Sequence, residues 1–323
     1  MSIDRTARIE LTEDRAPARR VDPRGFAEEA LFFGPPDAPL YGVLHTPGLM
    51  ASGGGTEPIY PPIIHIHSFG IEQVAAYRME VEFARAAAAA GFPALRFHLT
   101  GCGDSHGEFA RLTFDRMVDD VRTAVAFLDG RGLGRWPVLL GVRLGAEIAV
   151  RAAVALGGVR ALILWEPVGS PRAYFDSLLR SLLISALAQG RKSGETVASL
   201  TERVRAEGSV DVLGYPLHRA LCEDARPFVI PEGAAVSPDA LVVSIGKRMR
   251  APTAITDVLG ALAARGVRCE TREVRDEPGW QFNENPSHVC PALTETTIRW
   301  CRERISAAEM AGRRTPLGRI EVR

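Results

Sequence analysis

The chain has 323 residues, 46% of them hydrophobic, and its 39 Lys and Arg residues balance 39 Asp and Glu residues. This length and composition are typical of a globular protein with a substantial core, arranged as one large domain or two small ones. The zero formal net charge excludes an overall basic field for nucleic acid, and no run of about 20 apolar residues is present to span a membrane. Five cysteines without a C-x-x-C pair and a polar N-terminus predict a cytoplasmic protein with reduced thiols.

Strand and helix patterns alternate along the chain after a polar arm at residues 1–25. Residues 27–33 and 40–46 flank the turn signal Gly34-Pro35-Pro36-Asp37 and predict an opening hairpin. Further strands are predicted at 59–68, 94–98, 137–140, 160–165, 240–245 and 267–274, and helices at 74–90, 113–128, 144–156, 253–264 and 291–307. The alternation predicts a parallel sheet with helices on both faces. It stops between 165 and 240, where residues 171–239 are predicted to form helical segments.

An arginine flanked by glycines follows the strand predicted at 137–140. The sequence Gly141-x-Arg143-x-Gly145 leads into an Ala-rich helix and has the spacing of the nucleophile elbow G-x-S-x-G, with Arg143 in place of the serine. The glycines fit a strained turn that leaves no room for neighbouring Cβ atoms. Arg143 cannot attack a carbonyl, because its guanidinium stays protonated and offers no lone pair.

Residues 26–307 together resemble the α/β-hydrolase superfamily, and residues 65–70 resemble its strand ending in His-Gly, which supplies part of the oxyanion hole. A closer resemblance is to the second type of exosortase A system-associated hydrolase. It rests on Leu-x-Gly-Cys-Gly-Asp-Ser at 99–105, Gly-Val-Arg-Leu-Gly-Ala at 141–146, Trp-Glu-Pro-Val at 165–168, Arg-Ala-Tyr at 172–174, Val-Leu-Gly-Tyr at 212–215 and Trp-Gln at 280–281. The chain departs from that group at 67–70, where it has His-Ser-Phe-Gly and the group tends to have Pro-Pro-Phe.

The superfamily resemblance implies an α/β-hydrolase fold with an eight-stranded, mostly parallel sheet and a helical cap inserted after the sixth strand. We therefore divide the chain into an N-terminal arm (1–25), a core (26–168 and 240–307), a cap (169–239) and a C-terminal tail (308–323). A cap at this place covers the active site of such proteins.

The resemblance also locates the other two members of a Ser-His-Asp triad. The acid follows the seventh strand, but residues 244–249 contain no carboxylate, and Gln281 stands where the histidine is expected. His288 lies seven residues further on and could take that place. Because a triad works as a unit, these replacements argue against ordinary acyl transfer.

Arg143 should have an anion near it, because a cation is disfavoured at the N-terminus of a helix. One interpretation is an internal ion pair with Glu147 or Glu166, which we slightly favour. The other is a ligand carboxylate or phosphate, held by Arg143 together with backbone N–H groups of the elbow, such as that of Leu144.

Histidines are concentrated in the first third of the chain, and His67 and His98 should end neighbouring strands beside Arg143. With Cys102, Asp104 and His106 they form one candidate set of ligands for Zn²⁺, but the spacing fits no standard site. We favour hydrogen-bonding histidines that line a pocket, and no cofactor or metal.

Three other groups near the predicted pocket are candidates. Cys102 would be a nucleophile if a neighbouring histidine lowered its pKa, although a small residue there also serves packing. Ser68 would need His67 or His98 as its base. Trp280 and Gln281 would stack on and hydrogen-bond a ligand, or simply fill the space left by the missing histidine.

Two classes of function follow. The first is an enzyme acting on an ester, thioester or amide of a small or carrier-bound acyl substrate, through His67, Cys102, Arg143 and His288. The second is a hydrolase-like protein without triad chemistry that binds an anionic ligand or a protein partner. In either class the expected ligand-binding residues are Ser68, Phe69, His98, Leu144, Glu166, Trp280 and Gln281.

Overall fold

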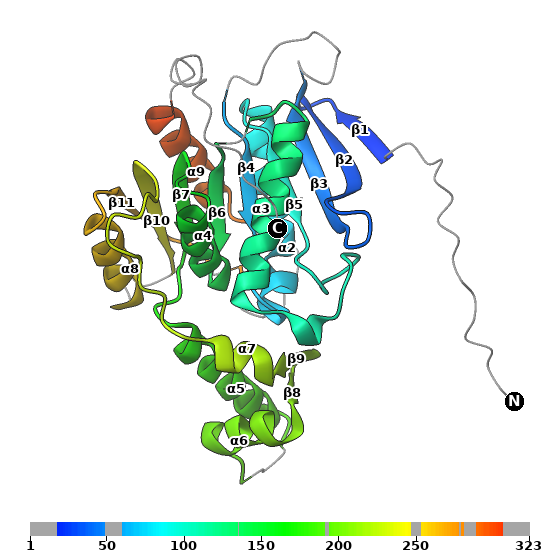
Figure 1. Cartoon of the computed structure of the whole chain (residues 1–323), viewed down its shortest axis with the longest axis vertical. Coiled ribbons are helices and arrows are strands. Elements are labelled where there is room, and N and C mark those ends of the chain that lie inside the picture. The colour runs from blue at the N-terminus through cyan, green and yellow to red at the C-terminus, as the bar shows by residue number, and fades with distance from the viewer. Residues whose placement is uncertain are drawn as a thin grey trace, which may run out of the picture.

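The computed structural model describes residues 18–48, 60–134, 136–190, 194–246, 253–277, 279–280 and 289–305. A nine-stranded sheet in the order β1-β2-β3-β5-β4-β6-β7-β10-β11 forms its centre (Figure 1). Its strands are β1 (Ala18–Asp22), β2 (Phe26–Phe33), β3 (Leu40–Pro47), β4 (Ile63–Ile66), β5 (Ala94–Phe97), β6 (Val138–Val142), β7 (Ala161–Trp165), β10 (Asp239–Ile245) and β11 (Arg268–Val274). The pairs from β5 to β11 are parallel, and those joining β1, β2, β3 and β5 are antiparallel.

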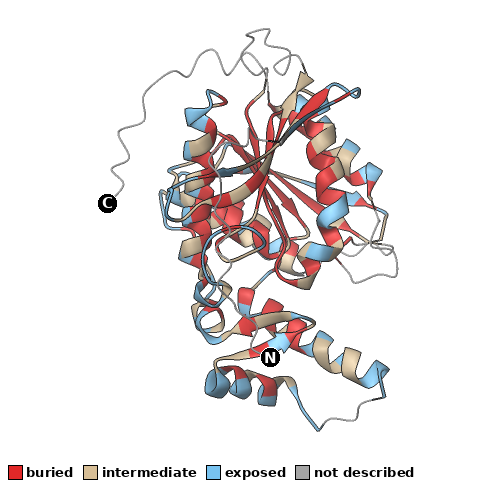
Figure 2. Ribbon diagram, turned by 90° about the vertical axis from the view of Figure 1, so that its right-hand side faces the viewer, coloured by how far each residue is buried: buried red, intermediate tan, exposed pale blue. Residues whose placement is uncertain are grey.

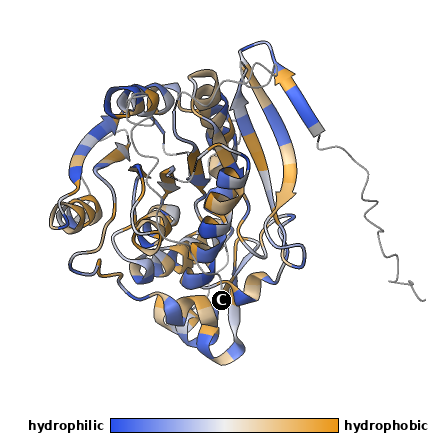
Figure 3. Cartoon of the chain, turned by 45° about the horizontal axis from the view of Figure 1, so that its top comes forward, coloured by the Kyte–Doolittle hydropathy of each residue, from blue (hydrophilic) through white to orange (hydrophobic). Residues whose placement is uncertain are grey.

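The sheet has nine strands, one more than the eight predicted from the sequence, and the additional strand is β1. β1 lies within the predicted arm and pairs with β2, with Arg19 opposite Glu29. Its sequence, ARRVD, is mostly hydrophilic (Figure 3), and Arg19, Arg20 and Val21 are exposed, as suits a strand at the edge of the sheet. Such a strand lacks the apolar alternation by which strands are recognised.

Helices cover both faces of the sheet and enclose two separate cores. Their bounds are α2 (Ile71–Ala89), α3 (Phe114–Gly130), α4 (Leu144–Ala155), α8 (Thr253–Ala263) and α9 (Pro291–Arg304). Side chains of β6 alternate between the cores: Leu139 packs with α3 and α4, whereas Val138 and Leu140 pack with α2 and α9. Figure 2 shows this buried interior along the central strands. No helix among the described residues is both long and apolar enough to cross a membrane.

The segment between β7 and β10, which we call the insert, holds α5 (Pro171–Ala188), α6 (Val197–Glu207), β8 (Ser209–Val212), β9 (Tyr215–His218) and α7 (Arg219–Asp224). It lies beyond the carboxyl ends of the parallel strands (Figure 1). The prediction of helical segments with a turn at 214–216 placed a turn here but missed the two strands of the β8–β9 hairpin. Its two-residue turn, Leu213-Gly214, has positive φ at both positions (55° and 93°), as the tight turns of hairpins require.

Candidate functional site

Arg143 occupies a strained turn between β6 and α4, with φ 55° and ψ −115°. Its backbone N–H donates to the carbonyl oxygen of Trp165 at 2.9 Å. The flanking glycines are required: a Cβ at Gly141 would lie 2.5 Å from Ala146 Cα, and one at Gly145 would lie 2.5 Å from the His67 carbonyl oxygen. The turn therefore has the tight strand-to-helix geometry that the glycine spacing predicts.

The carboxylate that pairs with Arg143 belongs to Glu72, in the first turn of α2. Nη2 of Arg143 lies 3.3 Å from Glu72 Oε1, and Nε lies 3.4 Å from both carboxylate oxygens. The two partners expected from the sequence are engaged elsewhere. Glu147 pairs with Arg151 on α4, and the Glu166 carboxylate accepts the Ile245 N–H at 2.8 Å. Only the backbone oxygen of Glu166 accepts from Arg143, at 3.4 Å.

Tyr174 of α5 completes this group and brings the insert into the site. Its buried phenol donates to Glu72 Oε2 at 2.9 Å. The Arg143 guanidinium lies 5.7 Å from the Tyr174 ring centre and 5.4 Å from that of Trp280. Both rings can thus stabilise the cation through their faces. We call Glu72, Arg143 and Tyr174 the elbow cluster.

Burial sets the protonation behaviour of the elbow cluster. It raises the pKa of the Glu72 carboxyl, while Arg143 and the Tyr174 hydroxyl oppose that shift. It also raises the pKa of Tyr174 well above its ordinary value, with the Glu72 carboxylate adding to the shift. The phenol therefore stays protonated and keeps its hydrogen for the bond to Glu72.

His67 is held by a residue that the sequence analysis did not select. Its Nδ1 contacts the Glu80 carboxylate of α2, and His65 lies on the other side of that carboxylate. The His98 ring lies 6.0 Å from that of His67, as expected for the ends of neighbouring strands. Burial lowers the pKa of His98 to about 4, so this ring is neutral at pH 7. Glu80 stands in an Ala-rich helix, and nothing in its local pattern marks it.

Cys102 and Ser68 both lie near the pocket, but neither is activated. Burial, with a smaller contribution from the Asp120 carboxylate, raises the pKa of Cys102 to about 12. The Ser68 hydroxyl is buried and has no hydrogen-bond partner among the described residues. Gln281 and His288 lie outside the described residues.

A pocket of about 490 Å³ opens beside the elbow cluster, between the insert and the ends of β4 and β5. It is lined mainly by apolar and aromatic side chains, including Phe69, Leu99, Phe109, Leu112 and Tyr215. Its polar lining residues include Ser68, Gln73, His98 and Cys102. The volume lies within the range of small-molecule sites.

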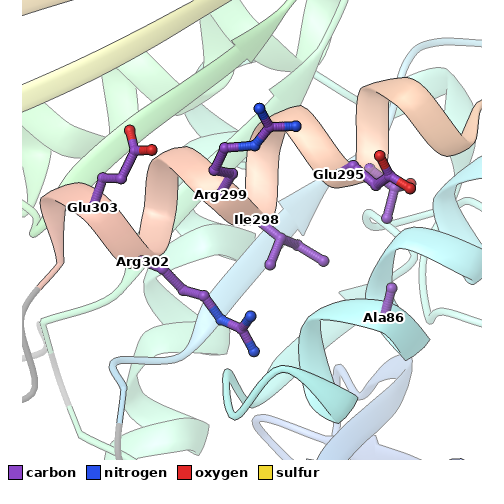
Figure 4. Close-up of a pocket in the computed structure, with 7 residues that line it drawn as sticks. Ala86, Glu295, Ile298, Arg299, Arg302 and Glu303 are labelled. Atoms are coloured by element: carbon purple, nitrogen blue, oxygen red, sulfur yellow. The ribbon is translucent and has the colours of Figure 1, made fainter.

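Two other hollows have different linings. One, of about 390 Å³, is bounded by Arg143, Glu166, Tyr174 and the beginnings of α5 and α8. The other lies between α2 and α9, where Glu295, Arg299, Arg302 and Glu303 surround Ile298 (Figure 4). No residue predicted for the site lines this second hollow, and its charged, solvated character suits a surface groove.

Solved structures share the fold of this chain. Est1E from Butyrivibrio proteoclasticus, solved with ferulic acid, matches with a TM-score of 0.58 and 15% identity over 85% of this chain and 99% of its own. The esterase Pf2001 of Pyrococcus furiosus matches with a TM-score of 0.53 and 13% identity, over 87% and 91%. The chain has the α/β-hydrolase fold. Mouse alpha/beta hydrolase domain-containing protein 10 also matches, with a TM-score of 0.50 and 19% identity, over 85% and 97%. No protein-family model and no curated protein matches the sequence.

Arg143 stands at the turn after β6, and the buried Leu144 follows it at the start of α4. Phe69 follows β4, and its side chain lines the pocket beside Ser68.

Proposed function

We propose that this protein binds an uncharged, largely apolar ligand in the pocket under the insert and performs no triad acyl transfer. The observation that carries the proposal is the elbow cluster, in which Arg143 is paired with Glu72 and Tyr174 donates to the same carboxylate. In this proposal the insert acts as a cap, which Tyr174 joins to α2 through Glu72.

The candidate catalytic residues support binding rather than chemistry. Arg143 has no nucleophilic lone pair, and a Cys102 thiol with a pKa of about 12 is almost entirely protonated at pH 7. His67 contacts Glu80 through Nδ1, and no hydrogen bond among the described residues joins its Nε2 to the Ser68 hydroxyl, which has no partner there. We therefore favour the binding interpretation over an enzyme that uses His67, Cys102, Arg143 and His288.

The pocket and the elbow cluster also favour an uncharged ligand over an anion. Glu72 already neutralises Arg143, and an entering carboxylate would face the Glu72 charge. The neighbouring pocket presents aromatic and aliphatic surface and a neutral His98. An acyl chain or aromatic ring, free or on a carrier, suits such a lining, with Ser68 and Gln73 available to hydrogen-bond a carbonyl group.

Residues that carry the resemblance to exosortase A system-associated hydrolases lie in or beside the proposed ligand site. Arg143 and Tyr174 belong to the elbow cluster, Trp280 stacks on Arg143, and Tyr215 lines the pocket. We propose that the chain is related to that group and that the shared motifs preserve a ligand site. Its five free cysteines support a reducing compartment such as the cytoplasm.

The test is binding of the neutral fluorophore N-phenyl-1-naphthylamine to the full chain. Val74 lines the pocket and is 52% exposed, so Val74→Trp should obstruct the pocket without disturbing the core. We expect stoichiometric binding to the wild type and at least tenfold weaker binding to this variant. Val229→Trp is the matched control, because Val229 is 75% exposed and does not line the pocket.

The same samples should be assayed with p-nitrophenyl butyrate. The proposal expects no turnover above that of the heat-denatured chain. Equal binding by the wild type and Val74→Trp, or turnover that Val74→Trp abolishes, would contradict it.

A further inference from the structure

We propose that His65, His67 and Glu80 form a buried binding site for a divalent transition-metal ion of the Zn²⁺ type. This goes beyond the proposed ligand binding and does not depend on it. It also differs from the set of His67, His98, Cys102, Asp104 and His106 considered from the sequence, because the structure brings together another histidine and a glutamate.

The local structure explains why these three side chains meet. His65 and His67 are two residues apart, so the alternation of an extended chain directs them to the same face of the sheet. α2 covers that face and places Glu80 against them, with its side chain fully buried. Phe83 of α2 and Trp165 of β7 close the surroundings, with ring centres 6.2 and 5.9 Å from that of His65.

The distance between His65 and the nearer oxygen of the Glu80 carboxylate suits two ligands of one metal ion better than a hydrogen bond. His65 Nε2 and Glu80 Oε1 face each other at 3.7 Å, and neither atom has a hydrogen-bond partner among the described residues. That separation is too long for a hydrogen bond. It is ordinary for two ligands of one ion, since donors about 2.1 Å from a metal lie roughly 3–4 Å apart.

His67 supplies the third donor. Its Nδ1 contacts the other carboxylate oxygen, Glu80 Oε2. His65, His67 and Glu80 each offer one donor atom, and these three atoms lie within 4.8 Å of one another. Two ligands at about 2.1 Å from one ion can be at most about 4.2 Å apart, so binding needs a contraction of a few tenths of an ångström. Small rotations of the two imidazole rings would supply it.

The chemistry of the side chains also fits a cation. The Glu80 carboxyl is fully buried, and the two imidazoles beside it offer nitrogen lone pairs to a metal. Two imidazoles and one carboxylate form a recurrent ligand set for Zn²⁺.

A cationic side chain, that of Arg96, stands near the cluster. Arg96 of β5 stands beside His65 in the sheet register. Its guanidinium is directed to other partners: Nε donates to His45 Nε2 at 3.2 Å, and the group lies 5.2 Å from the Tyr77 ring centre. An ion would reach the cluster from the pocket, since Ser68 and His98 line the pocket and His98 is adjacent to His67.

The experiment uses the full chain, stripped with a chelator, dialysed, and titrated with Co²⁺ and Zn²⁺. We expect one ion of either metal per chain, visible d–d absorption from the Co²⁺ form, and a Tm raised by Zn²⁺. His65→Phe, which keeps the ring volume, and Glu80→Gln should each lose the absorption and the rise in Tm. The control His106→Gln removes an exposed histidine outside the cluster and should change neither.

Two results would overturn the proposal. One is wild-type chain that binds Co²⁺ and Zn²⁺ only substoichiometrically, which would leave a hydrogen-bonded group in the core. The other is stoichiometric binding that survives in His65→Phe and Glu80→Gln, which would place the ion elsewhere. The wild-type titration decides the matter even if a variant fails to fold.

Discussion

Tyr174 donates its phenolic hydrogen to Glu72 at 2.9 Å, a bond that spans 102 positions of the chain and ties the insert to the first turn of α2. Because Glu72 also pairs with Arg143, this single carboxylate joins the insert, the elbow and the segment after β4. An arginine at the elbow is thereby compensated from within the protein.

The first prediction concerns the coupling between Arg143 and Glu72. A fully buried pair that loses one partner is destabilised by roughly 3–5 kcal/mol, and because Arg143 is 20% exposed we expect about 2–3 kcal/mol for Arg143→Met or Glu72→Gln. The double variant should recover part of this loss. Urea unfolding of the four proteins measures the coupling. As a control, the losses of stability from Arg143→Met and Glu147→Gln should simply add in their double variant. If the losses from Arg143→Met and Glu72→Gln also added, the ion pair between Arg143 and Glu72 would be contradicted.

The second prediction concerns the packing of the elbow. Gly145→Ala would place a Cβ 2.5 Å from the His67 carbonyl oxygen, so the backbone of β4 or α4 must move. We expect a loss of about 1–3 kcal/mol or more in the free energy of unfolding. Gly130→Ala at the end of α3 is the control, because its Cβ meets nothing within 4 Å, and it should be neutral or slightly stabilising. Equal effects would show that the elbow tolerates a side chain.

The core could be predicted from the sequence because its signals are local. Each buried strand is a short apolar run, and each flanking helix has its own apolar periodicity or Ala-rich composition. The tight turn at Arg143 was predictable for the same reason, since Gly141 and Gly145 mark it directly. β1 was missed because a polar edge strand has no such signal. The β8–β9 hairpin was missed because its short strands contain Asp211 and Pro216 and so lack the apolar run of the equally short β4 and β5.

The partners within the site could not be predicted in this way. Glu72 lies 71 positions from Arg143, and a glutamate in the first turn of a helix is common for local reasons alone. Glu147 is close to Arg143 in sequence, and Glu166 stands at the end of the neighbouring strand β7. Neither carboxylate pairs with Arg143. Glu80 was missed similarly, because its contacts with His65 and His67 exist only once α2 packs on the sheet.

The third prediction concerns Cys102. A pKa of about 12 leaves roughly 1,000-fold less thiolate than a thiol with an ordinary pKa near 9. Iodoacetamide at pH 7.5 should therefore alkylate Cys102 no faster than Cys269, as followed by peptide mass spectrometry. Urea-unfolded chain, in which all five cysteines should react alike, is the control. Alkylation of Cys102 ahead of the other four would restore it as a candidate nucleophile.

The fourth prediction is a loss of stability in mild acid. The pKa of His98 is about 4 in the folded chain and near 6.5 when unfolded, so the unfolded state binds more protons between these values. The free energy of unfolding should fall as the pH drops from 6.5 towards 4, with His65 and His45 contributing in the same direction. Urea unfolding of His98→Leu should show a shallower slope in this window, and an unchanged slope would refute the assignment to His98.

The most direct test of the account is the intact mass of the full chain after treatment with an excess of a fluorophosphonate probe at pH 7.5. With Arg143 at the elbow in place of a serine, we predict an unmodified mass, while a conventional serine esterase treated in parallel is fully labelled. A stoichiometric adduct on a pocket serine, above all on Ser68, would contradict the account and show that the chain retains an activated nucleophile.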